Sequence, residues 1–303
     1  MDEGSEWLAE RFEEQRGHLR AVAYRMLGSL SEADDAVQDA WVRVSQAGAD
    51  GVDNLGGWLT TIVARVCLNM LRARNTRREE SLDLHLPDPI ISREGDLQPE
   101  AEAVLADSVG LALQVVLDTL NPAERLAFVL HDMFDLPFDE IGPMVGRSPD
   151  AARQLASRAR RRVKGAEVRS PDPDVSRQRE VVDAFFAAAR GGNFGALVGV
   201  LHPDVVLRAD FGPGHASASR VVHGAEAVAR SAQAGANPAA RIHPALVNGA
   251  AGAVISQDGH PFLIMAFTVH DGRITEIDSI GDTERVARVA GVLIAEDLAG
   301  GQQ

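Results

Sequence analysis

The chain has 303 residues, with 30 Lys and Arg against 44 Asp and Glu, which gives a formal net charge of −14. This length predicts about two domains, and the absence of a long apolar run excludes a membrane-spanning helix. The acidic first residues do not form a secretory signal, and the lone Cys67 excludes a disulfide framework. We therefore predict a cytoplasmic protein whose acidity disfavours nonspecific nucleic-acid binding by the whole chain.

The first 80 residues are predicted to form helices. Apolar residues recur at helical spacing over 8–27, 33–44 and 59–70. We expect Ser31 to cap the second helix, and a glycine-bearing loop over 47–57 to separate the second helix from the third.

Residues 81–107 are rich in acids and prolines and are predicted to form a linker. Helical periodicity returns near Pro99. A further set of helices is expected over 108–168, where Asn121 and Pro122 mark one start. A short helix over 138–145 and a Ser148-capped helix complete this part.

The last two of these helices match the helix-turn-helix pattern. Successive residues of the second helix are 100° apart around its axis, which places one set of polar side chains on the outward face. These side chains could read base edges or bind phosphates. This set is Arg153, Gln154, Ser157, Arg158 and Arg161, with Arg158 on the flank. The alternative is the solvated basic face of an ordinary helix pair.

The third helix carries a second polar face, opposite its apolar stripe. Its members are Thr61, Arg65, Asn69 and Arg72. Trp58 at the start of this helix could stack on an unpaired base, although a tryptophan at such a position is more often part of the core.

After a proline-rich linker at 170–174, the pattern changes from helices to a mixture of helices and strands. One amphipathic helix around 181–186 precedes several short apolar runs, and His270 to Arg273 form a predicted hairpin turn. This pattern predicts an α+β domain with one curved antiparallel sheet.

Three blocks, in order, resemble the extracytoplasmic-function group of RNA polymerase sigma factors. The first comprises 24–29 and 32–41, the second is 57–69, and the third comprises 120–125, 138–142 and 148–162. The resemblance implies region 2 over 1–80 and region 4 over 108–168, two all-α modules. Region 2 would open the promoter −10 element, with the 47–57 loop capturing a flipped base, and region 4 would read the −35 element. Core RNA polymerase would be the partner, contacted through Asp34, Asp35, Gln38 and Asp39.

Residues 175–290 resemble the cone-shaped SnoaL-like domain attached to one subgroup of these factors. The motifs that carry this resemblance are Leu86, Pro87, Asp88 and Pro89 in the linker, then Asp210, Gly212 and Gly214, and finally Asp282. His85 stands where the subgroup has a tryptophan. The resemblance implies that these residues form a regulatory contact between the linker and the added domain, with the sign of the regulation left open.

Other functions were weighed for the C-terminal domain. Candidate acids and bases are His202, Asp204, Asp210, His223, His243 and Asp278, which form no tight motif. We therefore predict no enzymatic activity, no cofactor and no metal, and leave open a small ligand in the cone. The alternatives are a cyclase- or isomerase-like enzyme or a ligand sensor fused to a helix-turn-helix regulator, or a plain repressor that binds duplex DNA unaided.

Overall fold

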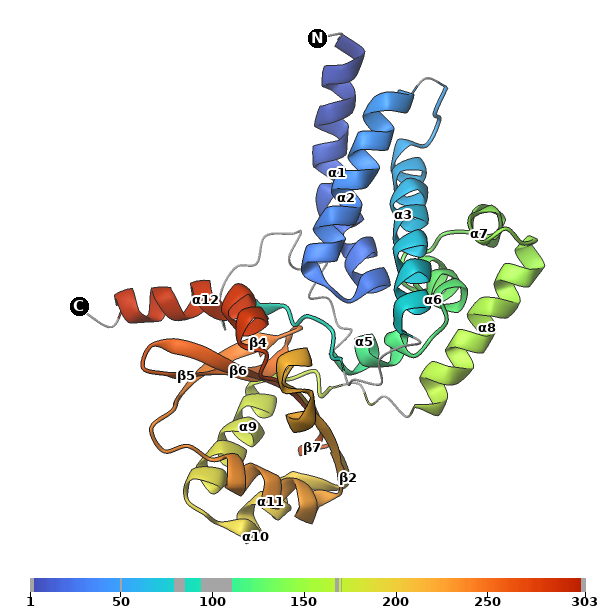
Figure 1. The fold of residues 1–303 in the computed structure, drawn as a ribbon. Helices are drawn as coiled ribbons and strands as arrows, with labels where there is room; N and C mark the ends of the chain where they lie inside the picture. The colour runs from blue at the N-terminus through green and yellow to red at the C-terminus, as the bar shows by residue number, and fades with distance from the viewer. Residues whose placement is uncertain are drawn as a thin grey trace. The chain divides into compact units, whose positions relative to one another are not determined.

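The computed structural model describes residues 3–49, 51–78, 85–93, 111–166, 169 and 171–300. The chain forms two compact units (Figure 1), each described here by itself. The first, the helical unit, lies within the first 168 residues. The second, the cone domain, combines residues 169–303 with the segments 83–97 and 106–112.

The helical unit begins with three helices that pack against one another. They are α1 (Glu3–Leu27), α2 (Leu30–Ala47) and α3 (Leu55–Arg78). Phe12, Tyr24 and Leu59 are completely buried between them. The predicted cap of the second helix is wrong: Ser29, not Ser31, accepts the Glu32 N–H. Gly28 has φ of 73° and the helix begins directly after Ser29, two residues earlier than a Ser31 cap predicts, so Ser31 falls inside the first turn.

The second half of the helical unit contains the helix-turn-helix. Its elements are α5 (Leu111–Asp118), α6 (Pro122–Phe128), the π-helical turn η1 (Val129–Met133), α7 (Phe138–Val145) and α8 (Pro149–Gly165). The Asn121 and Ser148 side chains accept the Glu124 and Ala151 N–H groups, as predicted for helix caps. Gly146 ends α7 with φ of 69°. The predicted helical start near Pro99 lies outside the described residues.

The cone domain is built on one curved sheet of seven strands among the described residues, in the order β1-β4-β5-β6-β7-β2-β3. The strands are β1 (Ile91–Ser92), β2 (Leu201–Asp210), β3 (Arg220–His223), β4 (Arg241–Val247), β5 (Ala250–Gln257), β6 (His260–His270) and β7 (Arg273–Ile280). The predicted hairpin turn between β6 and β7 is confirmed, with positive φ at Asp271 and Gly272.

The sheet is mixed rather than antiparallel, which corrects the sequence-based expectation. β2 and β7 are parallel neighbours, whereas every other pair is antiparallel. Four strands intervene along the chain between β2 and β7, so the two are not joined by a hairpin and the chain re-enters in the same direction. β1 was not predicted: the linker itself adds this edge strand by pairing with β4.

Helices cover the sheet, with α9 and α11 on one side and α12 on the other (Figure 1). The helices of this domain are α9 (Val175–Arg190), α10 (Phe194–Val200), the 3-10 turn η2 (Pro213–Ala218), α11 (Ala225–Gly235) and α12 (Thr283–Gly300). Phe185 of α9 meets Phe267 of β6 edge-on, with ring centroids 5.4 Å apart. Because side chains alternate along a strand, Leu207 and Ile277 face this core, and Arg208 and Asp278 face the opposite side. In the described part of the chain, no helix has the length and apolar character needed to cross a bilayer.

Candidate functional site

The predicted DNA-reading face of α3 is formed in part. Arg65, Asn69 and Arg72 are exposed on one side of the helix. Thr61 is half-buried, and its hydroxyl donates to the Gly57 carbonyl at 2.9 Å. Trp58 is also half-buried, so one part of its indole is available for stacking while the rest packs on the protein.

The outward face of α8 has the composition needed for a recognition helix. Arg153, Gln154, Ser157, Arg158 and Arg161 are all exposed, while Ala152, Leu155 and Ala159 are buried against α6 and α7. The Arg153 guanidinium lies 5.3 Å from the Phe138 ring centroid and pairs with the exposed Asp150 at 2.6 Å. Because an exposed ion pair contributes little free energy, this pair can exchange for a contact to DNA.

Several basic residues of α8 form ion pairs with acidic residues of the same unit. Arg158 and Arg162 both bind Glu124, whose side chain is only 6% exposed. Arg160 pairs with Asp132 at 2.6 Å. The charge block of α8 is therefore partly structural: Arg158 also neutralises a buried carboxylate.

Arg74 of α3 is structural in the same way. Its guanidinium donates to the Leu27 carbonyl at 3.1 Å and pairs with Glu32. This arginine therefore joins the end of α3 to the α1–α2 junction.

The acidic face of α2 is exposed throughout. Asp34, Asp35, Gln38 and Asp39 all lie on the solvent side of this helix, and Ala33, Ala36, Val37 and Ala40 form its buried side. Asp34 forms a 2.6 Å ion pair with Arg20 of α1. The other three project from one surface strip that could meet a basic partner.

The two halves of the helical unit are joined by buried polar bonds that the sequence did not indicate. The Arg125 guanidinium of α6 donates to the Arg25 carbonyl at 3.0 and 3.1 Å and pairs with Asp118. The Gln114 amide donates to the Tyr24 and Arg25 carbonyls at 3.2 Å. These bonds satisfy the carbonyls at the end of α1, so the described helices of both halves form one packed body.

The linker motif is buried in the cone domain. The five residues 86–90 are all buried. The Leu86 N–H donates to Asp210 Oδ2 at 2.9 Å. The Ile90 N–H donates to Asn248 Oδ1 at 3.1 Å, and its carbonyl accepts the Asn248 N–H at 2.8 Å. Together with the β1–β4 pairing, these bonds hold the segment as part of the domain.

Arg285 of α12 lies at the centre of this contact, which we call the linker site (residues 86–90, 210–212, 282 and 285). Its Nη1 donates to Asp210 at 3.0 Å, its Nε donates to Asp88 at 2.5 Å, and its Nη2 donates to the Leu86 carbonyl. All three side chains are at most 7% exposed. One guanidinium thus neutralises two buried carboxylates and fixes the linker backbone.

The glycine and Asp282 positions of the linker site have distinct roles. Gly212 has φ of 73° and ψ of 173°, and a Cβ there would overlap the Asp282 carboxylate. Asp282 Oδ1 accepts the backbone N–H of Arg285 at 3.0 Å and so caps α12. Gly214, in contrast, has open space around it and is not brought into this cluster.

Sequence reasoning identified Asp88, Asp210, Gly212 and Asp282 but missed Arg285. The available signal was charge, because the buried carboxylates of the linker and of the β2 end need a cation, and Arg285 is a basic residue three positions after Asp282. Cys67 is completely buried, and this burial raises the pKa of its thiol to about 12.

The candidate acids and bases of the cone do not converge. Asp210 belongs to the linker site, and His243 bonds Ser256 at 2.8 Å. Asp278 binds Arg208 at 3.0 Å on the opposite face from the Phe185 core. Burial raises the pKa of Asp278 to about 6, against the lowering effect of Arg208.

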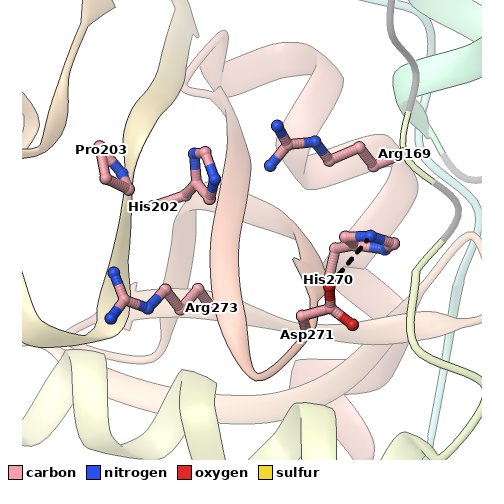
Figure 2. A pocket seen from close by; sticks show the side chains of 6 residues that line it. All are labelled: Arg169, His202, Pro203, His270, Asp271 and Arg273. Carbon is pink, nitrogen blue, oxygen red and sulfur yellow. Dashed lines mark ion pairs between the residues drawn. The ribbon is translucent and has the colours of Figure 1, made fainter.

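His202 lies in a separate surface depression. Figure 2 shows it with Arg169, Arg273 and the ion-paired His270 and Asp271. The His202 Nδ1 accepts the Asp204 N–H at 3.1 Å. Among the described residues, no cluster of three or more histidine, cysteine or acidic side chains is arranged to hold a metal.

Comparison with known proteins agrees with this geometry. The family models for sigma-70 region 2 and sigma-70 region 4 match residues 12–77 and 110–163. The ECF RNA polymerase sigma factor SigJ of Mycobacterium tuberculosis (strain ATCC 25618 / H37Rv) is 37% identical over 292 residues, covering 90% of this chain and 91% of the relative.

Solved structures give the same result. The crystal structure of M. tuberculosis SigJ has a TM-score of 0.72 and 35% identity, covering 91% of this chain and 97% of that one. An NTF2-like protein from Burkholderia xenovorans LB400 is similar to part of the chain, with a TM-score of 0.27, 20% identity and coverage of 39% and 98%. The C-terminal unit is an α+β domain built on a mixed sheet. The chain belongs to the ECF sigma factors of RNA polymerase, which direct the polymerase and are not enzymes.

Proposed function

We propose that this sigma factor reads promoters with two separate helices, α3 at the −10 element and α8 at the −35 element. The observation that carries the proposal is the exposed face of α8 in a helix-turn-helix. Arg153 and Gln154 lie in its first turns, where side chains of a recognition helix reach base edges. Arg65, Asn69 and Arg72 of α3, with the half-exposed Trp58, supply phosphate contacts and a stacking surface.

Core RNA polymerase binds, in this proposal, along the acidic strip of α2. Asp35, Gln38 and Asp39 would face a basic surface of the enzyme, and Asp34 would exchange its pair with Arg20 for a polymerase contact. Such complementarity raises the association rate and weakens with salt. Charge reversal at Asp35 and Asp39 together should therefore lower the capture of the chain by core enzyme.

The cone domain modulates this activity through the linker. The segment it holds, 86–90, lies between region 2 and region 4 in the chain, so its attachment limits the separation that the two regions can reach. Reading two distinct promoter elements requires the regions to part, whereas the helical unit packs them through Arg125 and Gln114. Attachment of the linker thereby couples the cone to the arrangement of the DNA-reading helices.

A transcription assay with purified core enzyme tests both parts. The intact chain should start transcription at a defined site, and Arg153→Ala or Gln154→Ala should weaken use of the −35 element. Removal of residues 169–303 should change the yield, in either direction, without moving the start site. Failure to start transcription would overturn the promoter-reading proposal, and an unchanged yield would overturn the modulation.

A further inference from the structure

A cavity of about 280 Å³ opens inside the cone, beneath α9 and α11. Its walls are mainly apolar and aromatic. They include Phe185 and Phe186 of α9, Phe211 after β2, Phe262 and Met265 of β6, and Ile277 of β7. A preformed apolar cavity with few polar groups is the usual form of a small-molecule site.

The charged groups of this cavity have one sign. Arg190 and Arg220 are the charged residues among the described residues that line it, and both are exposed at its edge. Arg190 donates to the Ala240 carbonyl at 2.8 Å, and Arg220 donates to Ser231 Oγ at 3.1 Å. Each guanidinium has five N–H donors, so both keep donors for an anionic group.

The same lining contains no aspartate, glutamate or histidine among the described residues. A general acid or base within reach of a bound molecule is needed for proton-transfer chemistry. The cavity is therefore equipped to hold a molecule and not to convert it by that route.

One wall of the cavity is also part of the linker site. Phe211 lines the cavity and lies between Asp210 and Gly212. Its ring packs on Gly281, where a Cβ would overlap it, and the Gly281 N–H donates to the Asp210 carbonyl at 2.7 Å. Asp210 in turn binds Leu86 and Arg285.

We propose that the cone binds a small apolar carboxylic acid, and that this ligand tightens the hold of the domain on the linker by packing against Phe211. The apolar body would lie in the cavity and the carboxylate would face Arg190 or Arg220. The volume corresponds to roughly nine water molecules at about 30 Å³ each, which suits a ligand of about ten non-hydrogen atoms. Because the space exists with the Phe211 ring in place, a ligand of this size supports the ring on Gly281 instead of displacing it. This inference rests on the proposed role of the linker site but is tested without transcription.

Three molecules with one alkyl chain and different head groups test the ligand class by calorimetry on the full chain: octanoate, 1-octanol and octylammonium. Octanoate should bind at least about tenfold more tightly than the other two, since a hydrogen bond to an ionised group is stronger than a neutral one. Equal binding of octanol and octanoate would overturn the proposal that the ligand carries an anionic head group. No binding by any of the three would overturn the site.

Variants on one helix test its location. Ala232 lines the cavity from α11, whereas Ala234 is exposed on the same helix and does not. Ala232→Phe should abolish octanoate binding, and Ala234→Phe should leave it unchanged. The reverse result, or equal effects of both, would place the ligand elsewhere.

Amide hydrogen exchange over residues 85–93 tests the coupling. Saturating octanoate should slow exchange of this segment several-fold in the intact chain, and should not slow it in Phe211→Leu, which removes the ring that joins cavity and linker site. Binding without slower exchange would overturn the coupling while leaving the promoter-reading and modulation proposals intact.

Discussion

Replacing Arg285 by alanine should release the linker from the cone domain. The substitution removes the cation shared by Asp88 and Asp210, whose side chains are 4% and 1% exposed. Leaving a buried charge without its partner costs about 3–5 kcal/mol. We expect release of residues 86–90 to carry Asp88 into water, so the share of this cost that belongs to Asp88 falls on linker attachment and not on the cone fold.

The lower figure, about 3 kcal/mol, corresponds to roughly a hundredfold change in the population of the released linker. Amide exchange measures that population when opening and reclosing are fast relative to the chemical exchange step. The Leu86 and Ile90 N–H groups, which donate to Asp210 and Asn248 in the attached state, should therefore exchange about a hundredfold faster in Arg285→Ala.

Arg288 provides a matched control on the same helix. Its guanidinium lies 3.8 Å from Asp88 and its side chain is 55% exposed, so Arg288→Ala should change exchange by less than about fivefold. Arg285→Lys should be intermediate, because one ammonium cannot reach all three acceptors of the guanidinium. Unchanged exchange at Leu86 and Ile90 in a folded Arg285→Ala protein would refute the reasoning.

Three other predictions address different parts of the molecule. Gln154→Ala should lower binding at one −35 base position by about 1–3 kcal/mol, and equal loss on every promoter sequence would contradict base reading by Gln154. Arg158→Ala should in addition lower the melting temperature, because it removes one of the two arginines that bind the buried Glu124. Burial lowers the pKa of His18 from its ordinary value of 6.5, so the folded state binds fewer protons than the unfolded state. The contribution of His18 to the free energy of unfolding should be full above pH 6.5 and should be lost as the pH falls toward the lowered pKa. The free energy of unfolding of His18→Gln, measured against pH, should lack this decrease. Gly212→Ala should cost about 1–3 kcal/mol in unfolding free energy, because the backbone there favours glycine and a Cβ meets Asp282. Gly214→Ala should stay within about 0.5 kcal/mol, and equal costs for the two would show that the Gly212 conformation is not required.

Local chemistry allowed much of the helical unit to be predicted. Asn121, Ser148 and Gly146 begin or end helices through groups close by in the chain, and apolar spacing alone gave the buried and exposed faces of α8. The second-helix cap failed because Ser29 and Ser31 both precede an acid by three residues, and only the turn at Gly28 decides between them.

Contacts between distant residues could not be predicted in the same way. Arg285 and Asp88 are 197 positions apart. The parallel pairing of β2 with β7 brings Asp210 to the start of α12, and the pairing of the linker with β4 brings Asp88 to the same place. The two-residue strand Ile91–Ser92 has no periodicity to detect. It forms because the edge of β4 presents backbone N–H and C=O groups, and the linker pairs with them.

The most direct test is promoter-specific transcription by core RNA polymerase reconstituted with the intact chain, Arg285→Ala or Arg288→Ala. The account predicts one shared start site that depends on the added chain, with a yield that changes for Arg285→Ala and not for Arg288→Ala. Equal yields from all three proteins would contradict control through the linker. A failure of the intact chain to give site-specific starts would contradict the account as a whole.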